Sequence, residues 1–103
     1  MLKTKFAKPF LFNKICIVGV GLIGGSIGRA AKHLGLAQWV VGVVRRDETA
    51  KAALGMKALD IATKDLKEGV HDADLVVLCG PVSSIVSQLK ILPRYLASKS
   101  VVI

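Results

Sequence analysis

One glycine pattern restricts the possible folds of this chain more than any other feature. Gly19, Gly21 and Gly24 form a G-x-G-x-x-G sequence. The pattern directly follows the apolar run at 15–18 and opens a stretch of helical character at 22–34. The same glycines carry little information in other contexts, but between a strand and a helix they are typical of a dinucleotide-binding turn. The context therefore predicts a strand, a tight turn and a helix that together receive a pyrophosphate.

Each glycine has its own physical role in such a turn. Gly19 lets the chain turn sharply out of the strand, Gly21 lets the backbone approach the pyrophosphate, and Gly24 lets the helix pack closely on the sheet. The backbone N–H groups near Leu22 and Ile23 are expected to point at the phosphates, whose charge the helix dipole favours. The alternative is a glycine-rich turn without a ligand. A P-loop is excluded, because no Gly-Lys-Ser/Thr sequence follows.

The remaining sequence alternates between short apolar runs and helical stretches. Strands are predicted at 14–19, 39–44, 59–62, 74–78 and 99–103, and helices at 22–34, 48–54, 65–70 and 81–92. Asp47 is expected to cap the second helix, and Gly35 and Gly55 to end the first and second helices. Alternation with short loops implies right-handed crossovers and a parallel sheet. The predicted fold class is α/β, a Rossmann-type doubly wound parallel sheet.

The two ends of the chain suggest its domain organisation. Residues 1–13 are predicted to form a basic N-terminal tail, and residues 14–103 an incomplete dinucleotide-binding domain. The chain stops inside the apolar run at 101–103, and natural domains rarely end within a central strand. The expectation is a fragment truncated within a strand, from which a catalytic and dimerisation domain made of helices is absent.

Composition excludes two classes of partner. Hydrophobic residues make up 52% of the chain and the mean hydropathy is +0.55, yet no apolar run approaches the ~18 residues of a spanning helix. Short β-branched runs are instead typical of strands buried on both faces, so we expect no membrane partner. The net charge is +8 with 5% aromatic residues. Nucleic-acid binding would need basic residues interleaved with aromatic platforms, so an anionic small ligand explains the charge better.

The end of the second predicted strand bears on cofactor choice. NAD-binding domains usually place an acid there, about 20 residues past the glycines, to hold the ribose 2′-hydroxyl. Here Arg45 and Arg46 come first and Asp47 follows them. Either arginine could pair with a 2′-phosphate or stack on adenine, which favours NADP over NAD. In the alternative, both arginines are solvated and Asp47 turns back to the ribose.

The turn after the fourth predicted strand is a second candidate region. It contains Cys79, Gly80, Pro81 and Val82. Loops at the carboxyl ends of strands face the ligand near the switch point of such sheets, so this turn is expected to line the cofactor's ribose and diphosphate. The alternative is an ordinary strand-to-helix turn with proline in the first helical turn.

No catalytic or metal-binding constellation is visible. His33 and His71 are predicted to lie away from the glycine loop. Two isolated cysteines, Cys16 and Cys79, form neither a metal-ligand cluster nor a disulfide framework. They are interpreted as core thiols in a reducing cytoplasm.

The run at 17–26, Ile-Val-Gly-Val-Gly-Leu-Ile-Gly-Gly-Ser, resembles the prephenate and arogenate dehydrogenases of tyrosine biosynthesis. Its Gly-Leu-Ile-Gly-Gly-Ser portion is the specific part. The run at 72–78, Asp-Ala-Asp-Leu-Val-Val-Leu, with Pro81 and Val82 beyond it, is also similar to this family. The likeness covers residues from Lys14 to Ile103.

The resemblance implies an oxidative decarboxylation of prephenate or arogenate with hydride transfer to NAD(P)⁺. It also implies a homodimer formed through a C-terminal helical domain. The family's catalytic histidine and serine-containing loop follow the strand on which this chain ends, so no catalytic residue is carried over. Arg45 and Arg46 depart from members that carry an acid there. Two other functions stay open: another NAD(P)-dependent oxidoreductase of the hydroxyacid dehydrogenase type, and a non-enzymatic nucleotide-sensing module.

Overall fold

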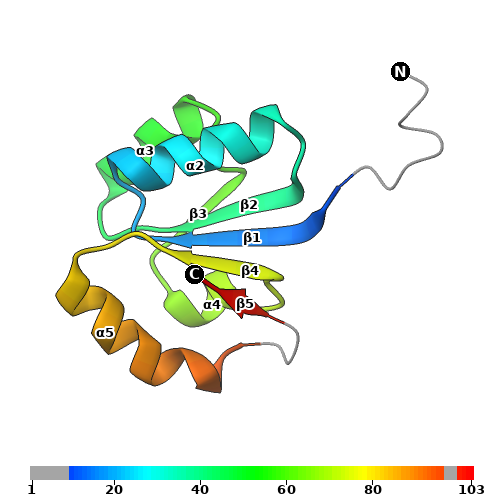
Figure 1. The fold of residues 1–103 in the computed structure, drawn as a ribbon. Helices are drawn as coiled ribbons and strands as arrows, with labels where there is room; N and C mark the ends of the chain where they lie inside the picture. Colours follow the sequence, from blue (N-terminus) through cyan, green and yellow to red (C-terminus); the bar gives the residue numbers. More distant parts are fainter. Residues whose placement is uncertain (1–9, 97–99) are drawn as a thin grey trace.

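Strands and helices alternate along the whole described chain and build one parallel sheet covered on both faces (Figure 1). The computed structural model describes residues 10–96 and 100–103. The strands are β1 (Phe12–Val18), β2 (Ala37–Val43), β3 (Ile61–Thr63), β4 (Leu75–Leu78) and β5 (Val101–Val102). The helices are α2 (Leu22–His33), α3 (Asp47–Gly55), α4 (Leu66–Val70) and α5 (Val82–Ile91), followed by the 3₁₀ turn η1 (Leu92–Arg94). The predicted Rossmann-type fold class is confirmed.

The sheet has its switch point at β1. The strand order is β3-β2-β1-β4-β5, and every pair is parallel. The chain runs outward from β1 to β3, then returns to the other side of β1 as β4. Helices α2 and α3 consequently cover one face, and α4 and α5 cover the other (Figure 1). In open sheets of this kind, ligands bind outside the carboxyl ends of the strands where the order reverses.

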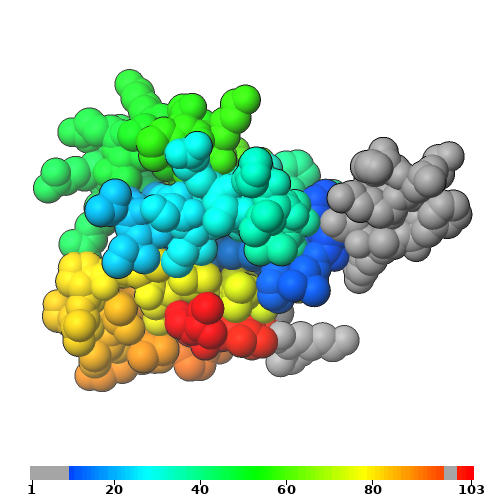
Figure 2. All heavy atoms as spheres, turned by 45° about the horizontal axis from the view of Figure 1, so that its top comes forward, coloured from blue at the N-terminus to red at the C-terminus, as the bar shows by residue number. Residues whose placement is uncertain are grey.

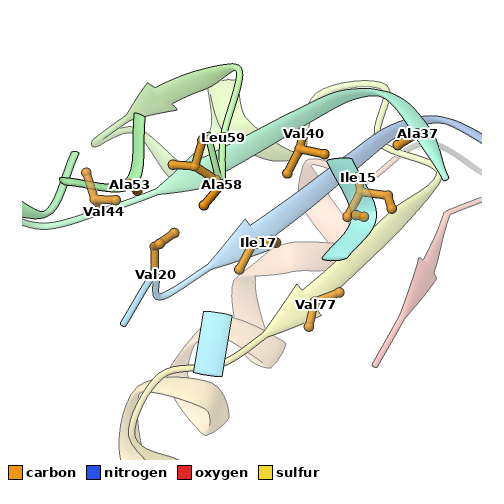
Figure 3. Close-up of a cluster of buried hydrophobic side chains, with 11 residues drawn as sticks. Ile15, Ile17, Val20, Ala37, Val40, Val44, Ala53, Ala58, Leu59 and Val77 are labelled. Atoms are coloured by element: carbon orange, nitrogen blue, oxygen red, sulfur yellow. The ribbon is translucent and has the colours of Figure 1, made fainter. Parts of the chain in front are cut away.

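The core consists of one apolar cluster on each face of the sheet. Ile15 and Ile17 of β1 belong to the cluster between the sheet and helices α2 and α3 (Figure 3). Cys16 and Val18 belong to the opposite cluster, together with Leu92. Successive side chains of a strand point to opposite faces, so a central strand that is covered twice must be apolar throughout. This explains the short continuous apolar runs of the sequence.

Helix α2 approaches its neighbours closely through two glycines. A Cβ atom added to Gly24 would lie 2.7 Å from the carbonyl oxygen of Gly19 and 3.1 Å from the side chain of Ile17. A Cβ atom on Gly28 would collide with the carbonyl oxygen of Ala58. Gly25, in the same helix, would place a Cβ with nothing within 4 Å. Close packing of the helix therefore depends on the absence of a side chain at positions 24 and 28.

Every strand has bounds that differ from the predicted ones by one or two residues. Strand β1 begins at Phe12, two residues before the predicted start at Lys14. The backbone N–H of Phe12 donates to the carbonyl of Leu36 (2.8 Å), and the N–H of Asn13 donates to Asp74 Oδ2 (2.6 Å). Strand β3 begins at Ile61, because the segment before it packs into the core at Leu59. The rest of the expected tail at 1–9, and Lys99, lie outside the described residues.

Several helix ends also differ from the prediction by one residue. Asp47 is the first residue of α3 and does not cap it; Arg46 holds the N-cap position, and no side chain caps the helix. Gly55 is the last helical residue, and Met56 follows it as the C-cap. Helix α5 ends at Ile91 and continues as η1, because Pro93 lacks the N–H that a further helical turn requires. No helix in the described ranges has the length and apolar character needed to cross a bilayer.

Candidate dinucleotide-binding site

A cavity of about 480 Å³ opens where the loops after β1, β2 and β4 meet. The start of α2 and the start of α5 both lie at this edge of the sheet (Figure 1), and they are neighbours in the view of Figure 2. The lining residues are Val18, Gly19, Val20, Gly21, Val43, Val44, Arg45, Arg46, Thr49, Lys64, Leu66, Cys79, Gly80, Pro81, Ser84 and Gln88. The cavity lies at the switch point of the sheet, where this fold receives ligands.

The glycine loop presents the N-terminus of α2 to this cavity. The N–H of Gly25 is the first in the helix to donate back, to the carbonyl of Gly21 at 2.8 Å. The N–H groups of Leu22, Ile23 and Gly24 precede it and have no acceptor within the helix. No side chain caps α2, and its first turn contains no acid. The unpaired N–H groups and the positive end of the helix dipole are therefore free to bind an anion.

The turns after β1 and β4 touch each other through backbone. Gly19 has φ +90, and a Cβ there would lie 2.8 Å from the backbone nitrogen of Gly80. The N–H of Cys79 donates to the carbonyl of Val18 (2.8 Å), which holds the two turns together. A side chain at position 19 would be strained by the positive φ and would push the second turn away. Glycine is needed here for both reasons.

Most of the predicted binding residues lie around the cavity. Those that line it are Gly19, Gly21, Arg45, Arg46, Cys79, Gly80 and Pro81. The other four, Leu22, Ile23, Gly24 and Val82, lie in the first turns of α2 and α5 beside it. The side chains of Leu22 and Ile23 are exposed, and their backbone N–H groups lie in the first turn of α2 beside the loop.

The lining is cationic. Arg45, Arg46 and Lys64 contribute positive charge, and among the described lining residues there is no Asp or Glu. Asp47 does not line the cavity; its Oδ1 lies 3.0 Å from Lys64 Nζ. In the alternative interpretation, Asp47 turns back to the ribose of the cofactor. In this structure its carboxylate faces Lys64 instead. An anionic ligand meets attraction at both the glycine loop and the end of β2.

Arg45 reaches across the cavity. Its guanidinium nitrogen Nη2 donates a hydrogen bond to Ser84 Oγ at 2.9 Å, which joins the end of β2 to α5. Both groups are on the surface side of the cavity, and Arg46 lies beside them as the N-cap of α3. The first arginine therefore faces the α5 side, whereas the second lies at the start of α3.

The two thiols are uncharged. Burial raises the pKa of the Cys16 thiol to about 12, and burial also raises the pKa of the half-buried Cys79 thiol. Both cysteines are free. A raised thiol pKa means the protonated form persists through neutral pH, so Cys79 places no negative charge beside a phosphate. Cys16 lies in the core as expected, whereas Cys79 is only partly covered and lines the cavity.

Sequence reasoning missed several lining residues. These are Val18, Val20, Val43, Val44, Thr49, Lys64, Leu66, Ser84 and Gln88. Ser84 and Gln88 are four residues apart on α5, which places them on one face of the helix. That spacing was available from the sequence once Pro81 was taken as the helix start.

The described lining of the cavity lacks the side chains that most often transfer protons in enzymes. None of the described residues around the cavity is His, Asp or Glu. His71 lies at the opposite end of the sheet, where its carbonyl accepts a hydrogen bond from Lys14 Nζ (2.6 Å). In the described part of the chain no three His, Cys, Asp or Glu residues gather into a metal site. The arrangement is suited to binding an anionic nucleotide.

Comparison with known proteins places this geometry among dehydrogenases. A family model described as NADP oxidoreductase, coenzyme F420-dependent, matches residues 14–103. Prephenate dehydrogenase of Bacillus subtilis is 35% identical over 78 residues, which are 76% of this chain and 21% of that protein. Synechocystis arogenate dehydrogenase has a TM-score of 0.78 at 31% identity, covering 86% of this chain and 31% of that one.

A further solved structure shows the same fold with ligands. It is prephenate dehydrogenase from A. aeolicus in complex with hydroxyphenyl propionate and NAD⁺, with a TM-score of 0.78 at 25% identity. The match covers 87% of this chain and 32% of that one. The chain thus spans between 21% and 32% of the length of these proteins. The predicted resemblance to prephenate and arogenate dehydrogenases is confirmed as a similarity of sequence and fold.

Proposed function

The chain belongs to the family described as NADP oxidoreductase, coenzyme F420-dependent, and from that premise we propose that it binds NADP or NAD in the cavity beside the glycine loop. The observation that carries the proposal is the uncapped N-terminus of α2, which opens into a cavity lined by three cationic side chains and no acid in the described residues. Free N–H groups and a helix dipole are what a pyrophosphate requires. The donors present therefore fit this cofactor.

The proposed roles follow from position. The N–H groups of Leu22, Ile23 and Gly24 hold the pyrophosphate, with Gly19 and Gly21 allowing its close approach. Cys79, Gly80, Pro81 and Val82 contact the ribose and diphosphate on the nicotinamide side, and Arg45 and Arg46 hold the adenosine side. Bound NAD(P)⁺ supplies hydride acceptance, and this chain supplies binding and orientation.

For the whole protein we propose a prephenate or arogenate dehydrogenase of tyrosine biosynthesis. The reaction oxidises the ring carbon that bears the hydroxyl, releases carbon dioxide and leaves an aromatic ring. The similarity to enzymes of both names supports the substrate class. The domain division, with a dinucleotide-binding domain from about residue 14 and a helical domain beyond residue 103 that forms a homodimer, is part of the proposal. So is a cytoplasmic location, which the two free thiols support.

Activity measurements test this assignment of roles. Residues 1–103 alone are expected to bind NAD(P)⁺ but to turn over neither prephenate nor arogenate, because no His, Asp or Glu lines the cavity among the described residues. The longer protein is expected to reduce NAD(P)⁺ with one of the two substrates, followed by absorbance at 340 nm. Turnover by residues 1–103 would show that the catalytic groups are misplaced, and failure of the longer protein with both substrates would refute the substrate class.

The cofactor preference is expected to be NADP⁺ over NAD⁺. A 2′-phosphate would replace the bond from Arg45 to the neutral Ser84 hydroxyl by one in which donor and acceptor are both charged, which is stronger. A net gain of about 1.4 kcal/mol corresponds to a tenfold preference. Calorimetric titration should show that Arg45→Ala weakens NADP⁺ binding about tenfold more than NAD⁺ binding, with the difference shrinking at high salt.

Ser84→Ala is the matched control for this prediction. It removes the hydroxyl that engages Arg45 but leaves the guanidinium available, so the preference for NADP⁺ should persist. Equal losses of both cofactors in Arg45→Ala would mean that the arginine stacks on the base. No loss for either would make Asp47 the residue to test for a ribose contact.

A further inference from the structure

Gln88 carries an unusual polar atom. Its Oε1 is buried and has no hydrogen-bond partner, and it is the one such side-chain atom found within residues 10–96 and 100–103. Gln88 also lines the cavity. A buried acceptor without a donor is destabilising, and native proteins contain few such groups. Gln88 itself lines the cavity, so a rotation of its side chain would present Oε1 to a ligand, and a donor on that ligand would remove this cost.

The position of Gln88 indicates which part of a bound ligand its side chain meets. It lies one helical turn after Ser84 on the same face of α5, and Ser84 holds the guanidinium of Arg45. Both Arg45 and Gln88 line a smaller recess with Ser83, Ser84 and Ser87. The amide therefore faces the space between the end of β2 and α5, and the glycine loop lies at another part of the same cavity.

A dinucleotide whose pyrophosphate sits at the glycine loop sends its adenosine half toward the end of β2. The base then enters the space between β2 and α5, where the apolar side chains of Val44 and Leu66 also line the cavity. Adenine carries an amino group that donates, next to ring nitrogens that accept. A primary amide is complementary to that edge, because its carbonyl accepts while its NH₂ donates.

We propose that Gln88 recognises the adenine base, with its buried Oε1 accepting a hydrogen bond from the 6-amino group. The inference rests on the proposed binding of NAD(P) and adds a base-specific contact to it. Gln88 thereby becomes a specificity-determining residue, separate from the residues that hold phosphate. A base without a donor at position 6 would leave Oε1 unpaired, and the protein should discriminate against it.

The test compares NAD⁺ with nicotinamide purine dinucleotide, in which a hydrogen atom replaces the 6-amino group, so that this edge of the base keeps an acceptor but has no N–H donor. Calorimetric titration of the unmodified protein should show about tenfold tighter binding of NAD⁺, the effect expected for leaving a buried acceptor unpaired. In Gln88→Leu, which removes the amide at similar size, the two affinities should become equal. Gln38→Leu removes an exposed glutamine of β2 and should keep the tenfold ratio.

Thermal unfolding verifies that each variant is folded, and Gln88→Met serves as a second apolar replacement. Equal binding of the two dinucleotides by the unmodified protein, or a ratio that survives in both Gln88 variants, overturns the inference while leaving the proposed function intact. Failure of the unmodified protein to bind either dinucleotide overturns the proposed function, and the inference with it.

Discussion

Gly21→Asp is expected to abolish binding of both NADP⁺ and NAD⁺ without unfolding the protein. A Cβ atom on Gly21 would meet nothing within 4 Å, and φ there is −118°, which other residues adopt readily. The fold therefore has room for the side chain. The added carboxylate, however, would occupy the mouth of the anion-binding loop. Two like charges about 4 Å apart repel by about 4 kcal/mol at the effective dielectric of a protein surface, so affinity should fall roughly a thousandfold.

Gly21→Asn separates charge from bulk in this experiment. Asparagine has nearly the shape of aspartate but no charge, so it should retain part of the affinity that aspartate loses. Calorimetric titration gives the two affinities, and thermal unfolding should show similar midpoints for both variants and the unmodified protein. Undiminished NAD(P)⁺ affinity in Gly21→Asp would mean that this loop does not receive the pyrophosphate.

The second large effect concerns stability. Gly28→Ala and Gly25→Ala make the same change in the same helix, α2. Because alanine has a higher helix propensity than glycine, this change alone raises the free energy of unfolding of either variant by up to about 1 kcal/mol. Their surroundings differ. The methyl group at position 25 meets nothing within 4 Å, whereas at position 28 it collides with the carbonyl oxygen of Ala58. Backbone cannot yield as a flexible side chain can, so α2 has to move off the segment after α3.

The two variants should therefore change stability in opposite directions. Gly25→Ala is expected to raise the free energy of unfolding by about 0.5–1 kcal/mol. Overpacking typically costs about 1–3 kcal/mol, and it should leave Gly28→Ala destabilised. Urea unfolding measures both variants, with the difference of about 1–3 kcal/mol between them read from the midpoints at unchanged slope. Equal shifts in the two variants would contradict the close approach of α2 to Ala58.

The strand–turn–helix unit was predictable because local residues determine it. The apolar run before Gly19, the spacing to Gly24 and the helical stretch after it all indicate one arrangement, and the structure has it. Element ends were harder to predict. Strand β1 extends to Phe12 only because Leu36 and Asp74, distant in sequence, accept its N–H groups.

The binding residues of the site also differ in how well the sequence predicts them. Backbone groups around Gly21 could be assigned from the motif, because their direction follows from the turn itself. The direction of a long side chain does not follow from sequence. Arg45 reaches Ser84 on a helix that lies 39 positions away, so its orientation depends on how α5 packs. Gln88 faces the cavity for the same reason: its spacing from Ser84 gives the shared helix face but not what that face packs against.

The two halves of the cavity rest on very different supports. Strand β1 is hydrogen-bonded on both sides, and its last four residues, Ile15, Cys16, Ile17 and Val18, are all buried. Helix α5 contains no fully buried residue among the ten that form it. Loops that extend from a doubly paired strand open only with much of the domain, whereas a sparsely buried helix can open locally at lower free energy. The phosphate end of a dinucleotide thus meets a preformed surface, and its base end meets one that can adjust. The entropy that the protein loses by becoming ordered around a bound dinucleotide is then concentrated at the base. Residues on α5 can therefore change the affinity without disturbing the phosphate loop.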